Sequence, residues 1–391
     1  MTEKSKYKVR QIIIIFLLLF CYLLCFNKQN YSILLSKLFS NNFHHLQVKP
    51  FYELFNSSIN KKTILIFEPN AYHHECSPGY SEYFISLGYN VDVLMHLSGI
   101  DSFCLFPNIE KIRILTFKKL SEIKKNAKYF SVIIKKYDFV LLQTTDRSKK
   151  KLYIKLGLLK ITNIIFVFHN IRFIKFGYSK YLKKNRIWTL GNFSKGLRIN
   201  PHYFGDIRIK DKNYKTKFFM TSTLERNYKY FIECVERLKE ENFNFEIIVT
   251  GRSTAFNIEM ISDNLIDNFI FKHKVSYSEL YKAIYISDYI IIPIIPSDKY
   301  ANEYKTIKVS GSIQLVYGFL KPALIHQEFS KFYNLDHKNS LIYNDSNLYE
   351  IMRKAILLNK MSYKKLQNNL HLIEKEIYKS SINNIKRTLK K

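Results

Sequence analysis

Two short segments of this 391-residue chain carry side chains able to do acid–base chemistry. The loop Pro69–Gly79 contains His73, His74 and Glu75, and His169 ends an apolar run further along. Imidazole and carboxylate groups can orient or deprotonate a hydroxyl that lies beside them. The alternatives are helix capping or loop packing for His74 and Glu75, and a buried, hydrogen-bonded role for His169. The sequence leaves both interpretations open.

A metal site in this loop is not expected. Residues 73–76 are potential ligands, but neighbouring side chains point apart and rarely converge on one ion. The cysteines contain no C-x-x-C pair, so they fit neither a disulfide framework nor a structural zinc site. A reducing environment is therefore the expectation for the main part of the chain. The five cysteines are Cys21, Cys25, Cys76, Cys104 and Cys234.

Residues 308–323, which read KVSGSIQLVYGFLKPA, indicate a second kind of chemistry. Gly311 and Ser312 open a predicted helix, and Gly318 ends it before another apolar run. The first turn of a helix presents free backbone N–H groups and the positive end of its dipole. The sequence therefore predicts an anion-binding loop at this helix start.

Short β-branched runs, separated by longer helical stretches, must position these loops. Continuous apolar runs of this kind are typical of buried parallel strands. The spacing Ser276-x-x-Glu279 also predicts a capping box at a helix start. The predicted fold class is α/β, with two Rossmann-like doubly wound domains whose ligand would bind in the cleft between them. The predicted strands are Thr63–Phe67, Val91–Met95, Arg113–Phe117, Asp138–Gln143 and Ile164–His169, then Phe218–Ser222, Phe245–Thr250, Asn268–Phe271, Tyr289–Pro293, Ala323–His326 and Leu341–Tyr343.

The amino-terminal run Ile12–Phe26 is apolar and uncharged over 15 residues and follows four basic residues. A cleaved signal peptide is the alternative, but no small residues of the A-x-A type follow Phe26. We expect a retained membrane anchor, with the remaining chain on the cytosolic side. The predicted organisation is an anchor (1–30), a connector (31–62), a first Rossmann-like domain (63–205), a second Rossmann-like domain (215–350) and a Lys-rich helix (351–391) that packs across the first domain or lies on the membrane.

Composition excludes several classes of protein. The chain is 47% hydrophobic with 11 Gly and 8 Pro, which rules out wholesale disorder and collagen-like or linker-like architectures. Its 62 Lys and Arg against 32 Asp and Glu give a net charge of +30, which attracts anions such as nucleic acid, acidic lipid headgroups or phosphorylated substrates. A solvated lysine surface without a partner is the alternative. Because no nucleic-acid recognition motif is present, nucleic acid is not an expected partner.

The segment 308–323 resembles the carboxyl-terminal half of GT-B fold glycosyltransferases, especially the retaining group called family 4. In that group a Gly/Ser-opened helix, a Gly turn and a Lys-Pro strand hold the nucleotide-sugar donor. The resemblance extends over roughly Ile64 to Leu357. The first-half loops with His73 to Glu75 and with His169-Asn170 match loops that face the acceptor in the family. Further matching pieces are Thr221–Leu238 with Arg226-Asn227, Thr250-Gly251-Arg252 and Ser287–Pro293.

Two departures from the family pattern affect the donor side. The family usually has two glutamates with seven residues between them, and the matching positions here are Thr306 and Gln314. Ser222-Thr223 stands where the family has a Gly-Arg pair. Gln314 could still hydrogen-bond a sugar or ribose hydroxyl. Because the arginine of that pair is missing, other cations must neutralise the diphosphate of the donor. For each candidate, the alternative is an exposed surface charge that binds no ligand. The candidates are Arg226, Arg252, Lys305 and Lys308.

The resemblance implies a retaining, metal-independent glycosyltransferase that moves a sugar from a nucleotide diphosphate donor to a lipid-linked or surface glycan acceptor. It implies no cofactor, because the nucleotide-sugar is a substrate, and the expected membrane partner is an anionic leaflet. A glycerol- or ribitol-phosphate-type transferase on a similar fold, or a non-catalytic membrane tether that binds an anionic polymer, is the alternative. The implied acceptor-side residues are His74, Glu75 and His169, and the implied donor-side residues are Arg226, Arg252, Lys305, Lys308, Gly311, Ser312 and Gln314.

Overall fold

The computed structural model describes residues 47–175, 178, 181, 184–193, 195–202, 208–223 and 226–390. The predicted anchor, residues 1–30, lies outside these residues, and so does the first half of the predicted connector. Within the described ranges, no helix is both long enough and apolar enough to cross a membrane.

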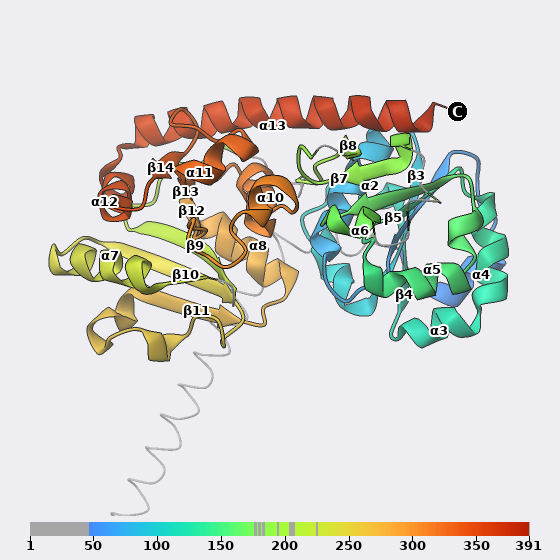
Figure 1. Ribbon diagram of the computed structural model, residues 1–391, viewed down its shortest axis with the longest axis horizontal. Helices are drawn as coiled ribbons and strands as arrows, with labels where there is room; N and C mark the ends of the chain where they lie inside the picture. Colours follow the sequence, from blue (N-terminus) through green and yellow to red (C-terminus); the bar gives the residue numbers. More distant parts are fainter. Residues whose placement is uncertain are drawn as a thin grey trace, which may run out of the picture. The chain divides into compact units, whose positions relative to one another are not determined.

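The first half of the chain forms an eight-stranded sheet, in the order β1-β4-β3-β2-β5-β6-β7-β8, in which all neighbours are parallel. All five predicted strands are present, and β1, β7 and β8 extend the sheet at its two edges (Figure 1). The strands are β1 (Gln47–Pro50), β2 (Thr63–Glu68), β3 (Asn90–His96), β4 (Ile112–Phe117), β5 (Phe139–Leu142), β6 (Ile164–Phe168), β7 (Ile187–Thr189) and β8 (Leu197–Arg198).

The second half forms a six-stranded parallel sheet in the order β11-β10-β9-β12-β13-β14. The predicted fold class of two parallel α/β sheets is therefore confirmed. The division between the sheets falls between β8 and β9, while the domain limits proposed from the sequence stay a prediction. The strands are β9 (Thr216–Ser222), β10 (Phe245–Gly251), β11 (Phe269–His273), β12 (Tyr289–Ile292), β13 (Ala323–His326) and β14 (Leu341–Tyr343).

Helices cover both sheets because the strands are apolar on both faces. In the second sheet, alternate residues of β12 belong to different clusters: Ile290 and Ile292 lie in one, and Tyr289 and Ile291 in the other. A sheet that is buried on both faces needs continuous apolar strands, which is the pattern in the sequence. The helices are α2 (Ser77–Ser86), α3 (Leu120–Lys125), α4 (Ala127–Ile133), α5 (Lys150–Lys155), α6 (Arg172–Lys175), α7 (Lys229–Glu240), α8 (Tyr277–Ile286), α9 (Glu303–Thr306), α10 (Gly311–Phe319), α11 (Gln327–Ser330), α12 (Leu348–Leu357) and α13 (Lys360–Leu389).

The carboxyl-terminal helix α13 joins the two halves. Its 30 residues span about 45 Å. Figure 1 shows α13 running along both halves. Leu370 and Ile377 pack in the core of the second sheet, while near the end of the helix Thr388 Oγ1 accepts a hydrogen bond from the indole nitrogen of Trp188 in β7, at 2.9 Å. The segment predicted as a single Lys-rich helix, 351–391, therefore contains most of α12 and all of α13, and α13 contacts the first sheet at Trp188.

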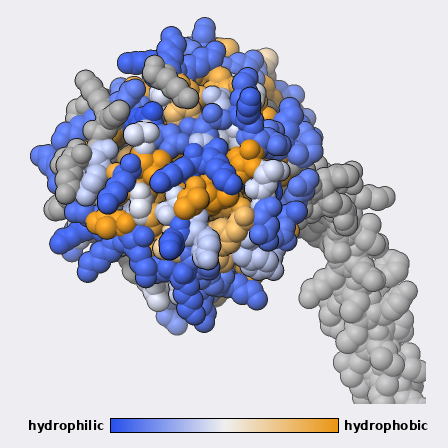
Figure 2. Space-filling view, turned by 90° about the vertical axis from the view of Figure 1, so that its right-hand side faces the viewer, coloured by the Kyte–Doolittle hydropathy of each residue, from blue (hydrophilic) through white to orange (hydrophobic). Residues whose placement is uncertain are grey.

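The outer face of the first half of the chain, which lies at the right of Figure 1, is mostly hydrophilic. Figure 2 shows a few hydrophobic side chains near the middle of this face, surrounded by hydrophilic ones. Exposed apolar residues of this half of the chain include Val48, Tyr129, Val132 and Ile154. Scattered apolar residues of this kind are ordinary on folded proteins and indicate no site by themselves.

Candidate functional site

A cavity of about 960 Å³ opens at the carboxyl ends of the strands of the first sheet, and we call it the cleft cavity. The loops after β2, β5 and β6 contribute to its wall, and the loop before α10 contributes from the second half of the chain. This is the position at which ligands of open parallel sheets bind. Residues that line it include Tyr72, His73, Thr144, Asp146, His169 and Lys308.

The loop after β2 is fixed to the end of β5. His73 adopts a left-handed backbone conformation, with φ 68°, just before the short helix η3 (His74–Cys76). The side chain of Gln143 donates to the carbonyl of His73 at 2.6 Å, and the hydroxyl of Ser77 donates to the Gln143 amide oxygen at 2.7 Å. The imidazole of His73 is therefore held at the wall of the cavity.

Glu75 connects the two halves of the chain beside the cavity. One carboxylate oxygen lies 3.4 Å from Nδ1 of His73, and the other accepts a hydrogen bond from the hydroxyl of Tyr277, in α8, at 2.9 Å. Burial raises the pKa of Glu75, but the hydrogen bond and charge of His73 and the hydroxyl of Tyr277 outweigh it and lower that pKa to about 2. Glu75 is thus an ionised carboxylate with both oxygens engaged.

His73 and His169 form a pair of imidazoles with different charge preferences. Their ring centroids are 4.3 Å apart, and Nε2 of His169 donates to the carbonyl of Gln143 at 3.0 Å. Burial, followed by the charge of His73, lowers the pKa of His169 to about 3. Burial also lowers the pKa of His73, but the hydrogen bond and charge of Glu75 raise it above its ordinary value. His169 is therefore neutral at neutral pH, with Nδ1 as its acceptor atom.

His74 does not line the cavity. Its side chain is fully buried, Nε2 lies 2.9 Å from the carbonyl oxygen of Asn70, and the ring packs directly against Gly99. Burial lowers the pKa of His74 to about 4, so the ring is neutral. The geometry agrees with the loop-packing alternative for this residue, and its catalytic role has no support from its position.

The start of α10 lies at the carboxyl end of β9. The Oγ atoms of Ser312 and Thr221 are 2.9 Å apart, which fixes the first turn of α10 to that strand. Ser310 precedes the helix without a side-chain cap from the described residues, and Gly311 is exposed with open space where a Cβ would lie. The first N–H groups of α10 are therefore positioned to bind an anion.

Lys308 brings the loop before α10 to the cleft cavity. Asn170 and Lys308 form an isolated antiparallel bridge, and the amide of Ile171 donates to the carbonyl of Ile307 at 3.1 Å. The ammonium of Lys308 lies 3.5 Å from a carboxylate oxygen of Glu303. This loop therefore presents a cation at the same wall as His169.

Gln314 is a buried amide with unmet hydrogen-bonding capacity. Its side chain is 2% exposed, and neither its oxygen nor its nitrogen has a hydrogen-bond partner among the described residues. Gln314 follows Gly311 by three positions, so the two share a face of α10. An orphaned buried amide is costly, and a ligand hydroxyl would satisfy it.

Two other predicted donor-side cations, Arg226 and Lys305, are not part of the lining of the cleft cavity. Arg226 is buried, with NH1 3.6 Å from a carboxylate oxygen of Asp298 and its guanidinium over the ring of Tyr304. The ammonium of Lys305 lies 2.5 Å from a carboxylate oxygen of Glu328. Each of these cations therefore has an internal carboxylate partner, and their donor-binding role stays a prediction.

Arg252 follows a strained turn at the end of β10. Gly251 has φ 113°, and a Cβ at that position would come within 2.6 Å of the carbonyl oxygen of Ser222. Arg252 itself is exposed. The predicted turn at the strand end is present, and the role of Arg252 stays a prediction.

Sequence reasoning missed Glu68, which lies beneath the cavity. Glu68 is fully buried, and its oxygens accept from the hydroxyl of Thr144 at 2.6 Å and the amide of Asn70 at 2.8 Å. Burial raises its pKa to about 7, against the lowering effect of the Thr144 hydrogen bond. A carboxyl group at the end of the apolar run TILIFE is the signal that could have found it.

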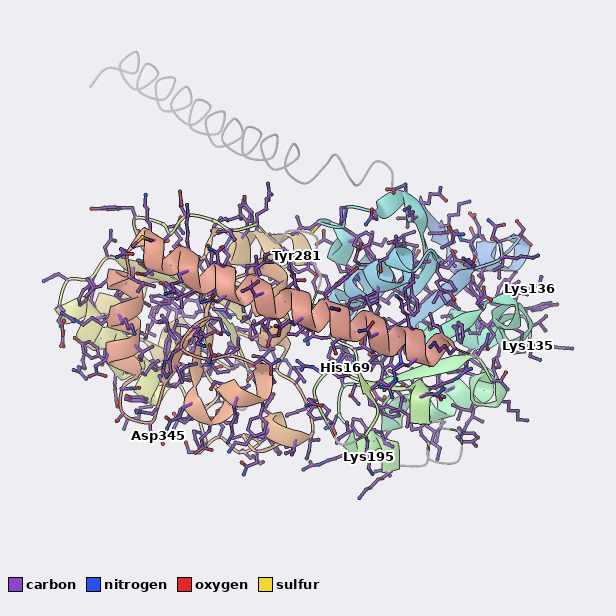
Figure 3. The ribbon with its side chains drawn as sticks, turned by 90° about the horizontal axis from the view of Figure 1, so that it is seen from above. Lys135, Lys136, His169, Lys195, Tyr281 and Asp345 are labelled. Atoms are coloured by element: carbon purple, nitrogen blue, oxygen red, sulfur yellow. The ribbon has the colours of Figure 1, made fainter. Side chains whose placement is uncertain are left out.

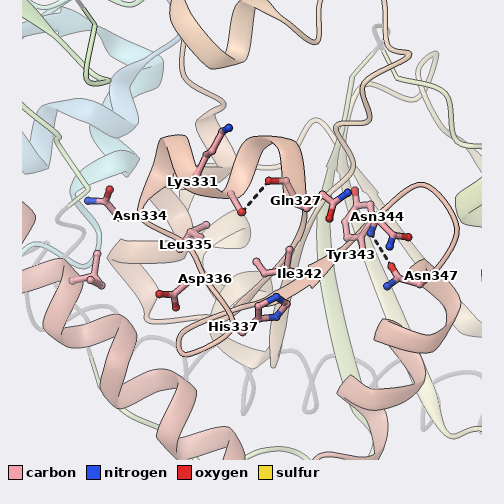
Figure 4. Close-up of a pocket in the computed structure, with 12 residues that line it drawn as sticks. Gln327, Lys331, Asn334, Leu335, Asp336, His337, Ile342, Tyr343, Asn344 and Asn347 are labelled. Atoms are coloured by element: carbon pink, nitrogen blue, oxygen red, sulfur yellow. Dashed lines mark hydrogen bonds between the residues drawn. The ribbon is translucent and has the colours of Figure 1, made fainter.

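Two further observations delimit the site. In the part of the chain that the structure covers, no group of three or more His, Cys, Asp or Glu side chains could hold a metal ion. Another cavity, of about 630 Å³, lies beside α11 and the end of β14, and its walls contain none of the predicted site residues (Figure 4). Its lining includes Gln327, Lys331, Asn334, Tyr343, Asn344 and Asn347.

Comparisons with known proteins identify the fold. No family model matches the sequence, and no curated protein matches it. Among solved structures, sucrose-phosphate synthase from Thermosynechococcus elongatus is similar, with a TM-score of 0.51 and 10% identity over 83% of this chain and 98% of that one. The chain has the GT-B fold. Family 4 membership stays a prediction.

Two other similar structures contain nucleotide. HepE of Anabaena, in complex with UDP and glucose, has a TM-score of 0.50 at 9% identity over 83% of this chain and 98% of that one. An alpha-glucosyltransferase in complex with UDP and a 13-mer DNA has a TM-score of 0.50 at 11% identity, covering 84% of this chain and 95% of that one. Identities this low establish the shared fold, and the activity must be argued from the site.

Proposed function

We propose that this chain is a glycosyltransferase that moves a sugar from a nucleotide diphosphate donor to an acceptor hydroxyl in the cleft cavity. The observation that carries the proposal is that Lys308 and Val309, just before α10, line one cavity of a GT-B fold together with the paired rings of His73 and His169. These groups supply an anion site and acceptor-orienting groups from opposite halves of the chain.

On the donor side, the diphosphate would bind at the first turn of α10. Its leaving group gains negative charge as the sugar departs, and the N–H groups of Gly311 and Ser312 together with the ammonium of Lys308 would stabilise that charge. The amide of Gln314 would hydrogen-bond a ribose or sugar hydroxyl. This assignment accounts for a buried amide that otherwise has no partner in the described chain.

On the acceptor side, the neutral His169 would orient a hydroxyl through Nδ1. Its low pKa makes it a weak base, so it suits hydrogen-bond acceptance better than full deprotonation. His73 carries the higher pKa of the two rings and can donate hydrogen bonds to an anion. Glu75 would keep His73 in place and hold the two halves of the chain together through Tyr277.

The finer parts of the proposal follow from the sequence. We propose retaining, metal-independent transfer because of the resemblance to family 4. A lipid-linked or surface glycan acceptor fits the apolar run Ile12–Phe26 and the net charge of +30, since an anionic leaflet would hold a basic, anchored enzyme near its acceptor. The catalytic part is proposed to lie on the cytosolic side of the membrane.

Melting temperatures with UDP, GDP, ADP and CMP test the donor site. A ligand that binds the folded state raises the melting temperature by mass action. We expect one nucleotide to do so for the unaltered chain, and Gln314→Leu to remove that effect. Gln314→Leu should also raise the melting temperature without nucleotide, because it removes an unsatisfied buried amide.

Gln367→Leu is the matched control. Gln367 is also buried, but its oxygen accepts from the amide of Lys210 at 3.2 Å and its nitrogen donates to the carbonyl of Leu320 at 3.1 Å. This variant should lower the melting temperature and keep the nucleotide effect. An equal response to several polyanions and no selective nucleotide effect would reject the donor site and favour the tether alternative.

A further inference from the structure

A cavity of about 750 Å³ lies at the opposite edge of the first sheet, where β5 and β6 begin. We call it the amino-edge pocket. The cleft cavity lies at the other ends of the same strands, and Figure 3 shows Lys135 and Lys136 far from His169. The amino-edge pocket is therefore separate from the proposed transfer site. Residues that line it include Lys135, Lys136, Asp138, Lys160, Asn163 and Arg186.

The pocket has an excess of positive charge. Lys135, Lys136, Lys160 and Arg186 face one carboxylate, that of Asp138, which accepts a hydrogen bond from a backbone amide at 3.2 Å. Across the described ranges, none of the four cations is ion-paired with a carboxylate. The field within the pocket therefore favours an anion.

Arg186 is the residue that the fold alone does not explain. NH1 of its guanidinium is buried and has no hydrogen-bond partner among the residues that the structure describes. The guanidinium lies 5.4 Å from the ring centroid of Phe139, and burial lowers the pKa of Arg186. A buried, charged donor without an acceptor costs more free energy than a neutral one. A ligand that places an acceptor atom beside NH1 of Arg186 would remove this cost.

Asn163 adds a second unmet group of the opposite kind. Its nitrogen donates to the carbonyls of Tyr137 and Asp138 at 2.6 and 3.1 Å, which fixes the amide in place. Its oxygen is buried and finds no donor within the described chain. The pocket therefore presents an unmet acceptor and unmet cations in one lining, and a ligand that matches both carries an anion and a hydrogen-bond donor such as a hydroxyl.

The four cations of the pocket lie at the ends of short helices. Lys135 and Lys136 lie in the last turn of η6 (Ile134–Lys136), and Lys160 lies in the last turn of η8 (Leu158–Lys160). Cations in such positions are favoured by the negative end of the helix dipole. Arg186 likewise ends a short helix, η10 (Lys184–Arg186), but a helix dipole does not supply the hydrogen-bond acceptor that its buried NH1 lacks.

We propose that the amino-edge pocket binds a phosphate group that carries a neighbouring hydroxyl, with Arg186 and Lys160 on the phosphate oxygens and Asn163 accepting from the hydroxyl. Arg is well suited to this because its planar guanidinium donates two parallel hydrogen bonds to a phosphate. Either the glycerophosphate headgroup of an anionic lipid or a soluble polyol phosphate supplies this chemistry. The site is additional to the proposed sugar transfer.

Calorimetric titration of the full chain with glycerol 3-phosphate tests the soluble form. Arg186→Gln and Lys160→Gln should each weaken binding at least about tenfold, since each removes a charged hydrogen bond to phosphate. Lys160 is exposed, so its replacement leaves folding intact. Lys118→Gln, an exposed change in the same half of the chain, is the control and should bind as the unaltered chain does.

Sedimentation with phosphatidylglycerol or phosphatidylcholine vesicles tests the lipid form. All proteins compared keep residues 1–46, so any contribution of that segment is common to them. Loss of glycerol phosphate binding, or of selective phosphatidylglycerol binding, in Arg186→Gln and Lys160→Gln supports the proposal and identifies the source. Binding that is unchanged in both variants, that is lost only in Lys308→Ala, or that is absent with every probe overturns it.

Discussion

Glu68 beneath the cleft cavity offers a quantitative test of the electrostatics of this site. Its side chain is fully buried and accepts hydrogen bonds from Thr144 and Asn70, and its pKa is raised by burial from 4.5 to about 7. Replacing Glu68 with glutamine keeps the shape and removes the titration. The stability difference between Glu68→Gln and the unaltered chain should therefore depend on pH.

The sign and size follow from the two pKa values. Below pH 4.5 the carboxyl of Glu68 is protonated in both the folded and unfolded states, so its titration costs nothing. Between pH 4.5 and about 7 the unfolded state ionises first, and the folded state loses stability as the pH rises. Above pH 7 the full cost is present, about 3 kcal/mol at about 1.36 kcal/mol per pKa unit.

Thermal unfolding at pH 5 and pH 8 measures this difference. The stability advantage of Glu68→Gln over the unaltered chain should be about 2 kcal/mol larger at pH 8 than at pH 5. Most of the cost of ionising the buried Glu68 develops in this interval. Any lost hydrogen bond is independent of pH and does not alter the comparison. Glu110→Gln, at an exposed position, is the control. An equal gain at pH 5 and pH 8, or a larger gain at pH 5, would refute the reasoning.

Three further substitutions test contacts around the site. Gly99→Ala should lower stability by about 1–3 kcal/mol in denaturant unfolding, because a Cβ would lie 2.5 Å from the ring of His74; unchanged stability would contradict that packing. Tyr277→Phe should raise the pKa of Glu75 in an NMR titration, since the Tyr277 hydroxyl lowers it; a constant pKa would exclude the contact. Gly251→Ala, at φ 113°, should cost about 1–3 kcal/mol in thermal unfolding, and a smaller loss would argue against that turn.

Much of the fold could be predicted because buried parallel strands leave a strong local pattern. The run TILIF is apolar at every position after Thr63, at which β2 begins. The capping box at Ser276 and Glu279 is also present at the start of α8. In contrast, β1 (QVKP) and β8 (LR) are short edge strands without an apolar run, so pairing with their neighbours defines them and the sequence does not.

The candidate site was predictable only in part, because its contacts join distant segments. The neighbouring residues Gly311 and Ser312 indicate a helix start from the local sequence alone. This prediction does not depend on where the helix lies in the fold. No local pattern indicates that Tyr277 donates to Glu75, 202 positions earlier, or that Arg226 is paired with Asp298 in the interior. Which of the 62 basic residues face a ligand is decided by tertiary packing.

The most direct test of the central claim is turnover. The full chain, given UDP-, GDP- or ADP-sugars and a bacterial membrane-lipid extract as acceptor, should release nucleoside diphosphate from one donor class, measured by a coupled assay. Lys308→Ala should reduce that release at least about tenfold, because it removes a charged contact to the leaving diphosphate, whereas Lys331→Ala, a change outside the cleft cavity, should not. Release that is undetectable with every donor, or equal in the Lys308→Ala variant, would contradict the account.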